Sequence, residues 1–213
     1  MKTEELVTML ATGVSAVEPN AATRRYGIAL TCGVAGSALL MAELLGVRRD
    51  LGEAVRLPMF WVKFVYVACL GVTSTIVAMR LSRPGTAVGG GAGALALVVI
   101  GMWIFGAVVL LGAEPAERAH LLLGTTSKTC PFFISLLSVP VFLAVTWAMK
   151  GLAPTRLRLA GTAAGLVSGS LAAVVYTLHC PEMAAPFLGT WYLLGVIIPT
   201  AVGMLLGPRL LHW

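Results

Sequence analysis

The chain has 213 residues, of which 58% are hydrophobic and 11% are charged, against about 25% charged in an ordinary soluble domain. Its mean hydropathy is +0.92. A soluble globule could not cover so apolar a chain with polar surface, so lipid must be its solvent. The formal net charge of +6 follows mainly from membrane topology, and it does not indicate direct nucleic-acid binding.

Residues 1–26 are predicted to be a retained cytoplasmic tail. Three glutamates and the lack of an apolar core before a small-residue cleavage site argue against a cleavable signal peptide. Thr3 can cap a short amphipathic helix, and Pro19 ends it. The apolar stripe of this helix is formed by Val7, Leu10, Val14 and Val17. Such a stripe can lie on the membrane or dock in a groove of a cytosolic partner, and the sequence leaves both open.

Six apolar runs of about 20 residues follow the tail, and each is long enough to cross a bilayer. They are residues 27–46, 59–79, 87–112, 131–149, 157–178 and 187–207. The third run is rich in glycine at its start, so we expect its helix to begin a few residues late. The links hold nearly all of the charge, and none is long enough for a soluble domain. We therefore predict an all-α integral membrane protein with a six-helix transmembrane domain, residues 27–213.

The orientation is predicted from the distribution of Lys and Arg. The tail, the second and fourth links and the C-terminus carry nine of these residues, whereas the other three links carry five. Because the more basic side of a membrane protein is cytoplasmic, both chain ends are predicted to lie in the cytoplasm.

Two further patterns lie inside the spans. Glu43 and Lys63 lie near the outer ends of spans one and two, where snorkelling or a mutual pair is favoured over ion transport. Gly161, Gly165 and Gly169 form a stripe of small residues on span five. This stripe favours close packing within the chain over a dimer interface.

The four cysteines divide by depth. Cys32 and Cys69 lie within spans and are expected to pack as small hydrophobic side chains. Cys130 and Cys180 each lie at the outer end of a span and each precede a proline. The predicted topology places both on the periplasmic side, where a structural disulfide could form.

Other chemistry is open to Cys130 and Cys180. The pair could respond to oxidants, or it could hold a heavy-metal ion together with a neighbouring donor. The neighbouring candidates are His179, Glu182 and His120. A disulfide-generating enzyme is disfavoured, because the chain lacks a Cys-x-x-Cys motif.

Several segments carry a family resemblance. They are GLAPTR at 151–156, LAGTAAG at 159–165, YTLHCPE at 176–182, GTWY at 189–192 and RLLHW at 209–213. TCP at 129–131 and the tail at 2–10 fit the same pattern. With these motifs the chain resembles the NrsF family, bacterial negative regulators of the extracytoplasmic-function sigma factor F.

The resemblance implies a six-span anti-sigma factor of the inner membrane, which is not an enzyme. Its cytoplasmic side would hold an extracytoplasmic-function sigma factor away from core RNA polymerase. Cys130 and Cys180 would sense an oxidant or a heavy-metal ion and trigger release. The candidate sigma-binding residues are Leu6, Val7, Leu10, Val14 and Val17. The alternative is a small membrane transporter or a membrane thiol redox protein.

Overall fold

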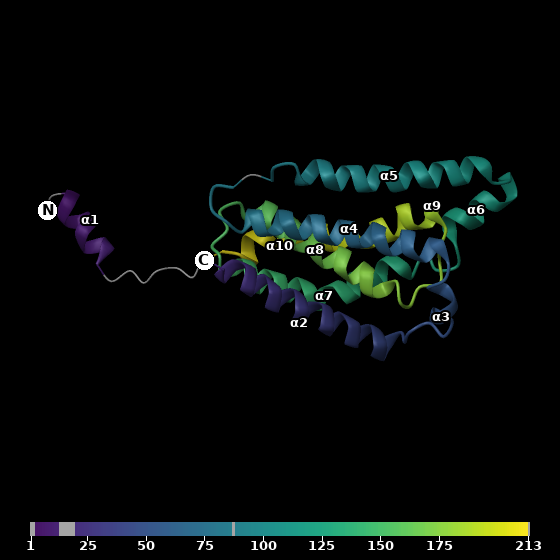
Figure 1. Ribbon diagram of the computed structural model, residues 1–213, viewed down its shortest axis with the longest axis horizontal. Helices are drawn as coiled ribbons and strands as arrows, with labels where there is room; N and C mark the ends of the chain where they lie inside the picture. Colours follow the sequence, from purple (N-terminus) through teal and green to yellow (C-terminus); the bar gives the residue numbers. More distant parts are fainter. Residues whose placement is uncertain (1–2, 13–19, 87, 213) are drawn as a thin grey trace.

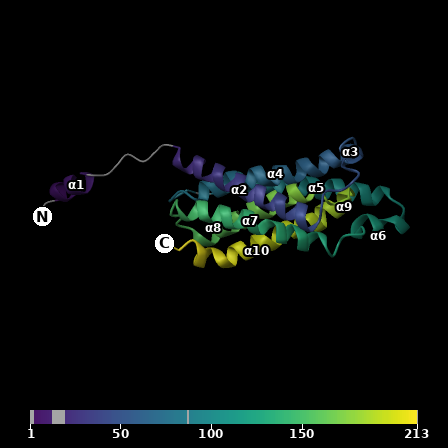
Figure 2. The ribbon, with the colours of Figure 1, turned by 90° about the horizontal axis from the view of Figure 1, so that it is seen from below.

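The protein is a bundle of six long apolar helices that run along a common axis (Figures 1 and 2). The computed structural model describes residues 3–12, 20–86 and 88–212, and within these ranges it contains no strand. Five spans are single helices: α2 Ala21–Leu44, α4 Pro58–Leu81, α5 Gly91–Gly112, α7 Cys130–Lys150 and α8 Leu157–Tyr176. The sixth span joins α9 Ala185–Phe187, the π-helical turn η1 Leu188–Tyr192 and α10 Leu193–Leu210. The predicted all-α, six-span architecture is confirmed.

The helix bounds differ from the predicted ones by a few residues. The first span begins at Ala21 rather than Gly27, because the polar residues before Gly27 continue the helix. The third begins at Gly91, late as expected, since Gly89 adopts a φ of +61° that does not fit a helix. Pro58 and Pro131 lie at the starts of α4 and α7, where a missing N–H costs nothing.

The short helices gather at one end of the bundle. Figure 1 shows α3 Leu51–Ala54, α6 Pro115–Leu123 and α9 at the end opposite to the start of α2 and the finish of α10. The even number of spans brings the first and last long helices back to the same end. We call the end that carries α3, α6 and α9 the short-helix end.

Helix α8 is the centre of the bundle and contacts α2, α4, α7 and α10. Its small residues allow the neighbouring helices to pack closely around it. A Cβ added at Gly165 would lie 2.7 Å from the Thr200 Cα, and one at Gly169 would lie 2.9 Å from the Val196 Cα. The small-residue stripe therefore packs within the chain, as predicted, and brings the α8 and α10 backbones together.

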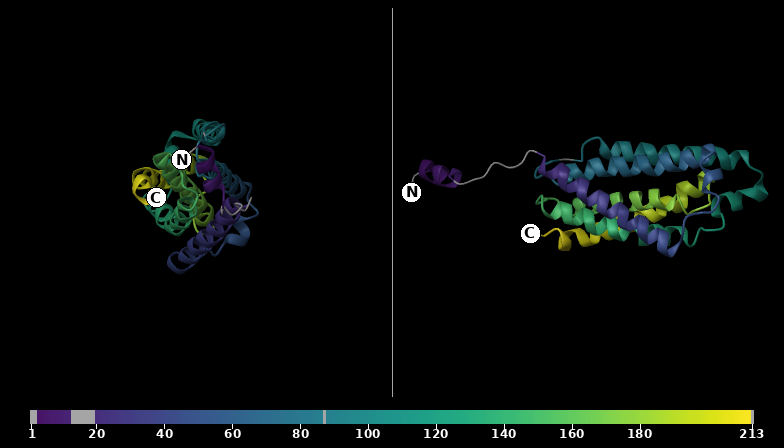
Figure 3. Two further views of the ribbon diagram at one scale, coloured as in Figure 1. Left: turned by 90° about the vertical axis from the view of Figure 1, so that its left-hand side faces the viewer. Right: turned by 60° about the horizontal axis from the view of Figure 1, so that its bottom comes forward.

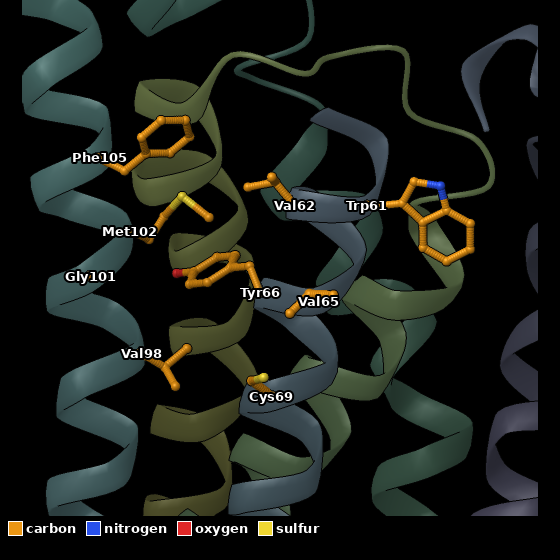
Figure 4. A pocket seen from close by; sticks show the side chains of 9 residues that line it. All are labelled: Trp61, Val62, Val65, Tyr66, Cys69, Val98, Gly101, Met102 and Phe105. Atoms are coloured by element: carbon orange, nitrogen blue, oxygen red, sulfur yellow. The ribbon is translucent and has the colours of Figure 1, made fainter. Parts of the chain in front are cut away.

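Helix α5 lies at the margin of the bundle, as the end-on view in Figure 3 shows. Between α5 and α4 runs a groove of about 490 Å³ lined by apolar side chains. In Figure 4, Val98, Met102 and Phe105 project from α5, and Tyr66 projects from α4 toward them. The Tyr66 hydroxyl is buried, and no described residue forms a hydrogen bond with it. In a bilayer this open groove faces the acyl chains.

The tail contains α1, Thr3–Ala11, which begins where the sequence predicts. Every described residue of α1 is exposed, including Leu6, Val7 and Leu10 of the predicted stripe. Val14 and Val17 lie outside the described residues.

Candidate functional site

Cys130 and Cys180 meet at the short-helix end of the bundle. Cys130 is the first residue of α7, and Cys180 lies in the link between α8 and α9. Both are fully buried and both are free thiols. The two thiols lie within hydrogen-bonding reach of each other. The structure therefore brings the two predicted residues into contact in the reduced state.

Cys32 and Cys69 are far less enclosed than expected. Both are exposed on the outer surfaces of α2 and α4, and Cys69 lines the groove in Figure 4. The expectation that they pack inside the bundle is wrong. Their helices present them to lipid, which accepts a small apolar thiol as readily as a protein core does.

Backbone hydrogen bonds hold both cysteines in place. The Cys130 amide donates to the Thr126 carbonyl at 2.9 Å, and the Cys180 amide donates to the Tyr176 carbonyl at 3.0 Å. The Arg48 amide donates to the Leu178 carbonyl at 3.1 Å. The link after span one is thus fixed to the segment 178–184, which we call the Cys180 segment.

Lys63 reaches the same segment from α4. Its ammonium donates to the carbonyl of Cys180 at 2.8 Å and to the carbonyl of Glu182 at 3.0 Å. The side chain is fully buried, whereas Glu43 is exposed. Snorkelling is therefore wrong for Lys63, and so is the Glu43–Lys63 pair, because tertiary packing turns this lysine inward onto carbonyl oxygens.

Glu182 connects the Cys180 segment to the turn before α7. One of its carboxylate oxygens, Oε1, accepts hydrogen bonds from the Thr125 amide and the Thr125 hydroxyl, both at 2.7 Å. Gly124, with a φ of +52°, allows this approach, because a Cβ there would lie 2.8 Å from the carboxylate. The contact fixes the turn that leads into Cys130 against the segment that carries Cys180.

The predicted metal donors are engaged elsewhere. His179 Nδ1 lies 2.9 Å from the Gly46 carbonyl oxygen, and Glu182 is bound to Thr125. His120 is exposed on α6. Across residues 3–12, 20–86 and 88–212, no three His, Cys, Asp or Glu side chains are grouped to hold a metal ion. A heavy-metal ion at Cys130 and Cys180 stays a prediction, and His179 or Glu182 would have to leave its present partner to join it.

The surroundings of Cys180 favour a thiolate. The hydrogen bond with Cys130 lowers the pKa of Cys180 most, burial opposes this, and the Lys63 charge lowers the pKa further. Tyr192 ends η1, and its buried hydroxyl has no hydrogen-bond partner among the residues that the structure describes. Single π-helical turns of this kind are frequent at functional sites. Because the thiolate is the nucleophilic and metal-binding form of cysteine, Cys180 is the more reactive sulfur of the pair.

Sequence reasoning missed three of the residues around the pair. The sequence marks Lys63 as unusual, because it is a charged residue within an apolar run, but its carbonyl partners lie more than a hundred residues away in the chain. Nothing in the sequence marks Thr125 or Tyr192, because polar loop residues and tyrosines near a span end are common.

Comparisons with known proteins agree with the sequence motifs. Residues 10–213 match the family described as negative regulator of sigma F, NrsF. The chain is 57% identical over its whole length to the probable anti-sigma-F factor NrsF of Azospira oryzae, and the alignment covers all of that protein. It is 39% identical, again with both chains fully covered, to the anti-sigma-F factor NrsF of Caulobacter vibrioides. No solved structure matches the chain.

Proposed function

The chain belongs to the NrsF family, and we propose that it is an anti-sigma factor that holds an extracytoplasmic-function sigma factor at the bacterial inner membrane. The observation that carries this proposal is full-length similarity to two anti-sigma-F factors. The chain would act as a binding protein rather than as an enzyme. A transporter or a thiol redox enzyme is the less favoured hypothesis, since neither accounts for this similarity.

The exposed face of α1 supports a docking role for the tail. Leu6, Val7 and Leu10 lie on one face of the helix, and Leu10 is 66% exposed. An apolar stripe on a short helix fits a hydrophobic groove of a partner protein. Glu4 and Glu5 in the first turn disfavour attachment to anionic lipid instead. In the proposed topology this helix lies in the cytoplasm, where a sigma factor is available.

The cysteine pair is the proposed sensor. Two free thiols in contact can form a disulfide without a large backbone movement, because disulfide geometry requires neighbouring Cβ atoms. In the proposed orientation the pair faces the periplasm, an oxidising compartment in which disulfides form and persist. We therefore favour an oxidant as the signal over a heavy-metal ion, for which the described residues offer two thiols but no grouped third ligand.

A signal at the pair must cross the membrane to reach the tail. Cys130 begins α7, and α7 contacts α2, the helix that continues from the tail. Gly36 of α2 packs against Pro140 of α7, because a Cβ added at Gly36 would lie 3.1 Å from the Cβ of the proline. A movement of α7 would therefore be transmitted to α2 through direct packing, since closely packed helices have few intermediate positions.

Co-purification from membranes tests the proposed function. The full-length chain should retain its cognate sigma factor, and a Leu10→Asp variant should lose it, because a charge buried in an apolar groove is costly. Thr8→Asp is the matched control: at 100° per residue, Thr8 lies away from Leu6 and Leu10, so binding should persist. Both variants should reach the membrane in normal amounts. Failure of the wild-type chain to retain any sigma factor would refute the proposal.

Oxidation is tested in the same complex. Treatment with hydrogen peroxide should release the sigma factor from the wild-type chain but not from Cys130→Ser or Cys180→Ser variants. Cys32→Ser and Cys69→Ser variants should respond like the wild type, because these thiols lie on the outer surfaces of α2 and α4. Release by cadmium but not by peroxide would favour the metal as the signal.

A further inference from the structure

Lys63 is a buried cation whose partners, as the structure describes them, include no carboxylate. Its side chain has no exposed surface. Its ammonium is bound to two backbone carbonyls, at 2.8 and 3.0 Å, and lies 5.0 Å from the centroid of the Tyr192 ring. Carbonyl dipoles and an aromatic face compensate a positive charge only in part, and an uncompensated buried charge is strongly destabilising.

One group near the Lys63 ammonium can supply the negative charge that its hydrogen-bond partners lack. The ionisable groups that interact with the Lys63 ammonium are, strongest first, Cys180, Cys130, Arg48 and Glu182. Arg48 is a cation paired with Asp50 at 2.6 Å. The Glu182 carboxylate is bound to Thr125, and only its backbone carbonyl meets Lys63. The Cys180 sulfur is the remaining group that can supply an anion beside the ammonium.

The contacts around Cys180 bear on the charge of its sulfur. Cys130 lies within hydrogen-bonding reach of the Cys180 sulfur. The Lys63 ammonium is bound to the carbonyl of Cys180 itself, so its positive charge lies beside the residue that carries the sulfur. The contacts around Cys180 therefore favour negative charge on its sulfur.

We propose that Lys63 is the positioning residue of the cysteine pair: it fixes the Cys180 segment through two carbonyls and places its charge at the Cys180 sulfur, so that Cys180 reacts first with a peroxide. This inference rests on the proposed sensor function of the pair.

The reaction balances with a peroxide as the oxidant. The Cys180 thiolate attacks one peroxide oxygen, the O–O bond breaks, and an S–O bond forms while hydroxide leaves. The Cys130 sulfur then attacks the Cys180 sulfenic acid, the S–S bond forms, and the hydroxyl leaves as water with the Cys130 proton. The two sulfurs lose two electrons and the peroxide gains them. The disulfide is neutral, so Lys63 loses its counter-charge and its hold on the Cys180 segment weakens.

The test uses the purified full-length chain in detergent with Cys32→Ser and Cys69→Ser, so that only the pair reacts. Dimedone traps sulfenic acid after hydrogen peroxide is added, and peptide mass spectrometry assigns it to Cys180 or Cys130. The trapped sulfenic acid should be mainly on Cys180. At a pH below the pKa of Cys180, Lys63→Met should slow its formation about tenfold, the change in thiolate that one pKa unit produces. Lys63→Arg should restore most of the rate.

Two controls separate charge from folding. Lys63→Gln keeps a donor for the carbonyls but removes the charge, so it should fold like the wild type and still react slowly. Lys150→Met, at the exposed opposite end of α7, should change nothing. Hydrogen exchange in residues 178–184 should be faster in Lys63→Met than in Lys63→Gln.

The inference is overturned if the neutral Gln variant reacts as fast as the wild type, or if sulfenic acid collects on Cys130. These rates are measured without a sigma factor. A failure of sigma-factor retention would therefore count against the proposed function alone, and a failure here against the role of Lys63 alone.

Discussion

The close approach of α8 and α10 makes a sharp prediction for Gly165→Ala. The added Cβ would lie 2.7 Å from the Thr200 Cα and 2.7 Å from the Pro199 carbonyl carbon, and it would meet the Pro199 carbonyl oxygen more closely still. Ordinary van der Waals contact begins at 3.4 Å. All of these atoms belong to the backbone, so no side chain can rotate away, and the two helices must move apart.

The cost can be bounded from overpacking in other proteins. Extra methyl groups in a well-packed interior typically cost about 1–3 kcal/mol. This corresponds to a folding equilibrium constant lowered about 5- to 150-fold. Alanine also gains up to about 1 kcal/mol over glycine in helix propensity, and a control must remove this contribution.

Gly101→Ala is the matched control. Gly101 lies in α5, and a Cβ there meets no atom within 4 Å. Its only effect is the gain in helix propensity, so the difference between the two variants isolates the clash at α8 and α10. We expect Gly165→Ala to be the less stable by about 1–3 kcal/mol.

Reversible unfolding with a denaturing detergent, followed by loss of helicity, measures this difference. Equal stabilities, within about 0.5 kcal/mol, would show that the α8 and α10 backbones are not in close contact. Because α8 leads into the Cys180 segment, peroxide oxidation of the pair should also be slower in Gly165→Ala and unchanged in Gly101→Ala.

Three further predictions concern the short-helix end and the topology. Glu182→Ala removes the carboxylate bonded to Thr125, so hydrogen exchange at the Thr125 amide should accelerate at least tenfold, corresponding to about 1.4 kcal/mol for a charge-assisted bond; unchanged protection would contradict the contact. The pKa of Cys180 is lowered, so its thiolate persists at neutral pH. A free cysteine, with a pKa of about 8.5, loses thiolate tenfold for each pH unit below that value, whereas the modification rate of Cys180 should fall only at lower pH. Peptide-resolved mass spectrometry with a small thiol reagent measures this, and a profile like that of free cysteine would refute it. Finally, a periplasmic reporter should be active after Pro115 and inactive after Pro154, and the reverse would place the cysteine pair in the cytoplasm.

The sequence by itself determined the six spans and the central packing contact. Crossing a membrane demands a continuous apolar run, because every backbone polar group must be satisfied inside the helix, and such runs are local features of the chain. The small-residue face of α8 can also be predicted from the local sequence, because spacing alone places Gly161, Gly165 and Gly169 on one face. Helix ends were less well determined, as Ala21 shows, because polar residues can extend a span beyond the hydrocarbon.

Only the tertiary structure decided how the site is built. Both cysteines were identified from their depth and their prolines, but nothing local indicated that Lys63 would turn onto the carbonyls of Cys180 and Glu182. In sequence these partners lie more than a hundred residues from Lys63. They meet because α8 has small side chains, so that α4 and α7 can pack closely against it. This packing brings the start of α4, the start of α7 and the Cys180 segment to the same end. A lysine near a span end can snorkel outward or turn inward, and burial by neighbouring elements decides between the two.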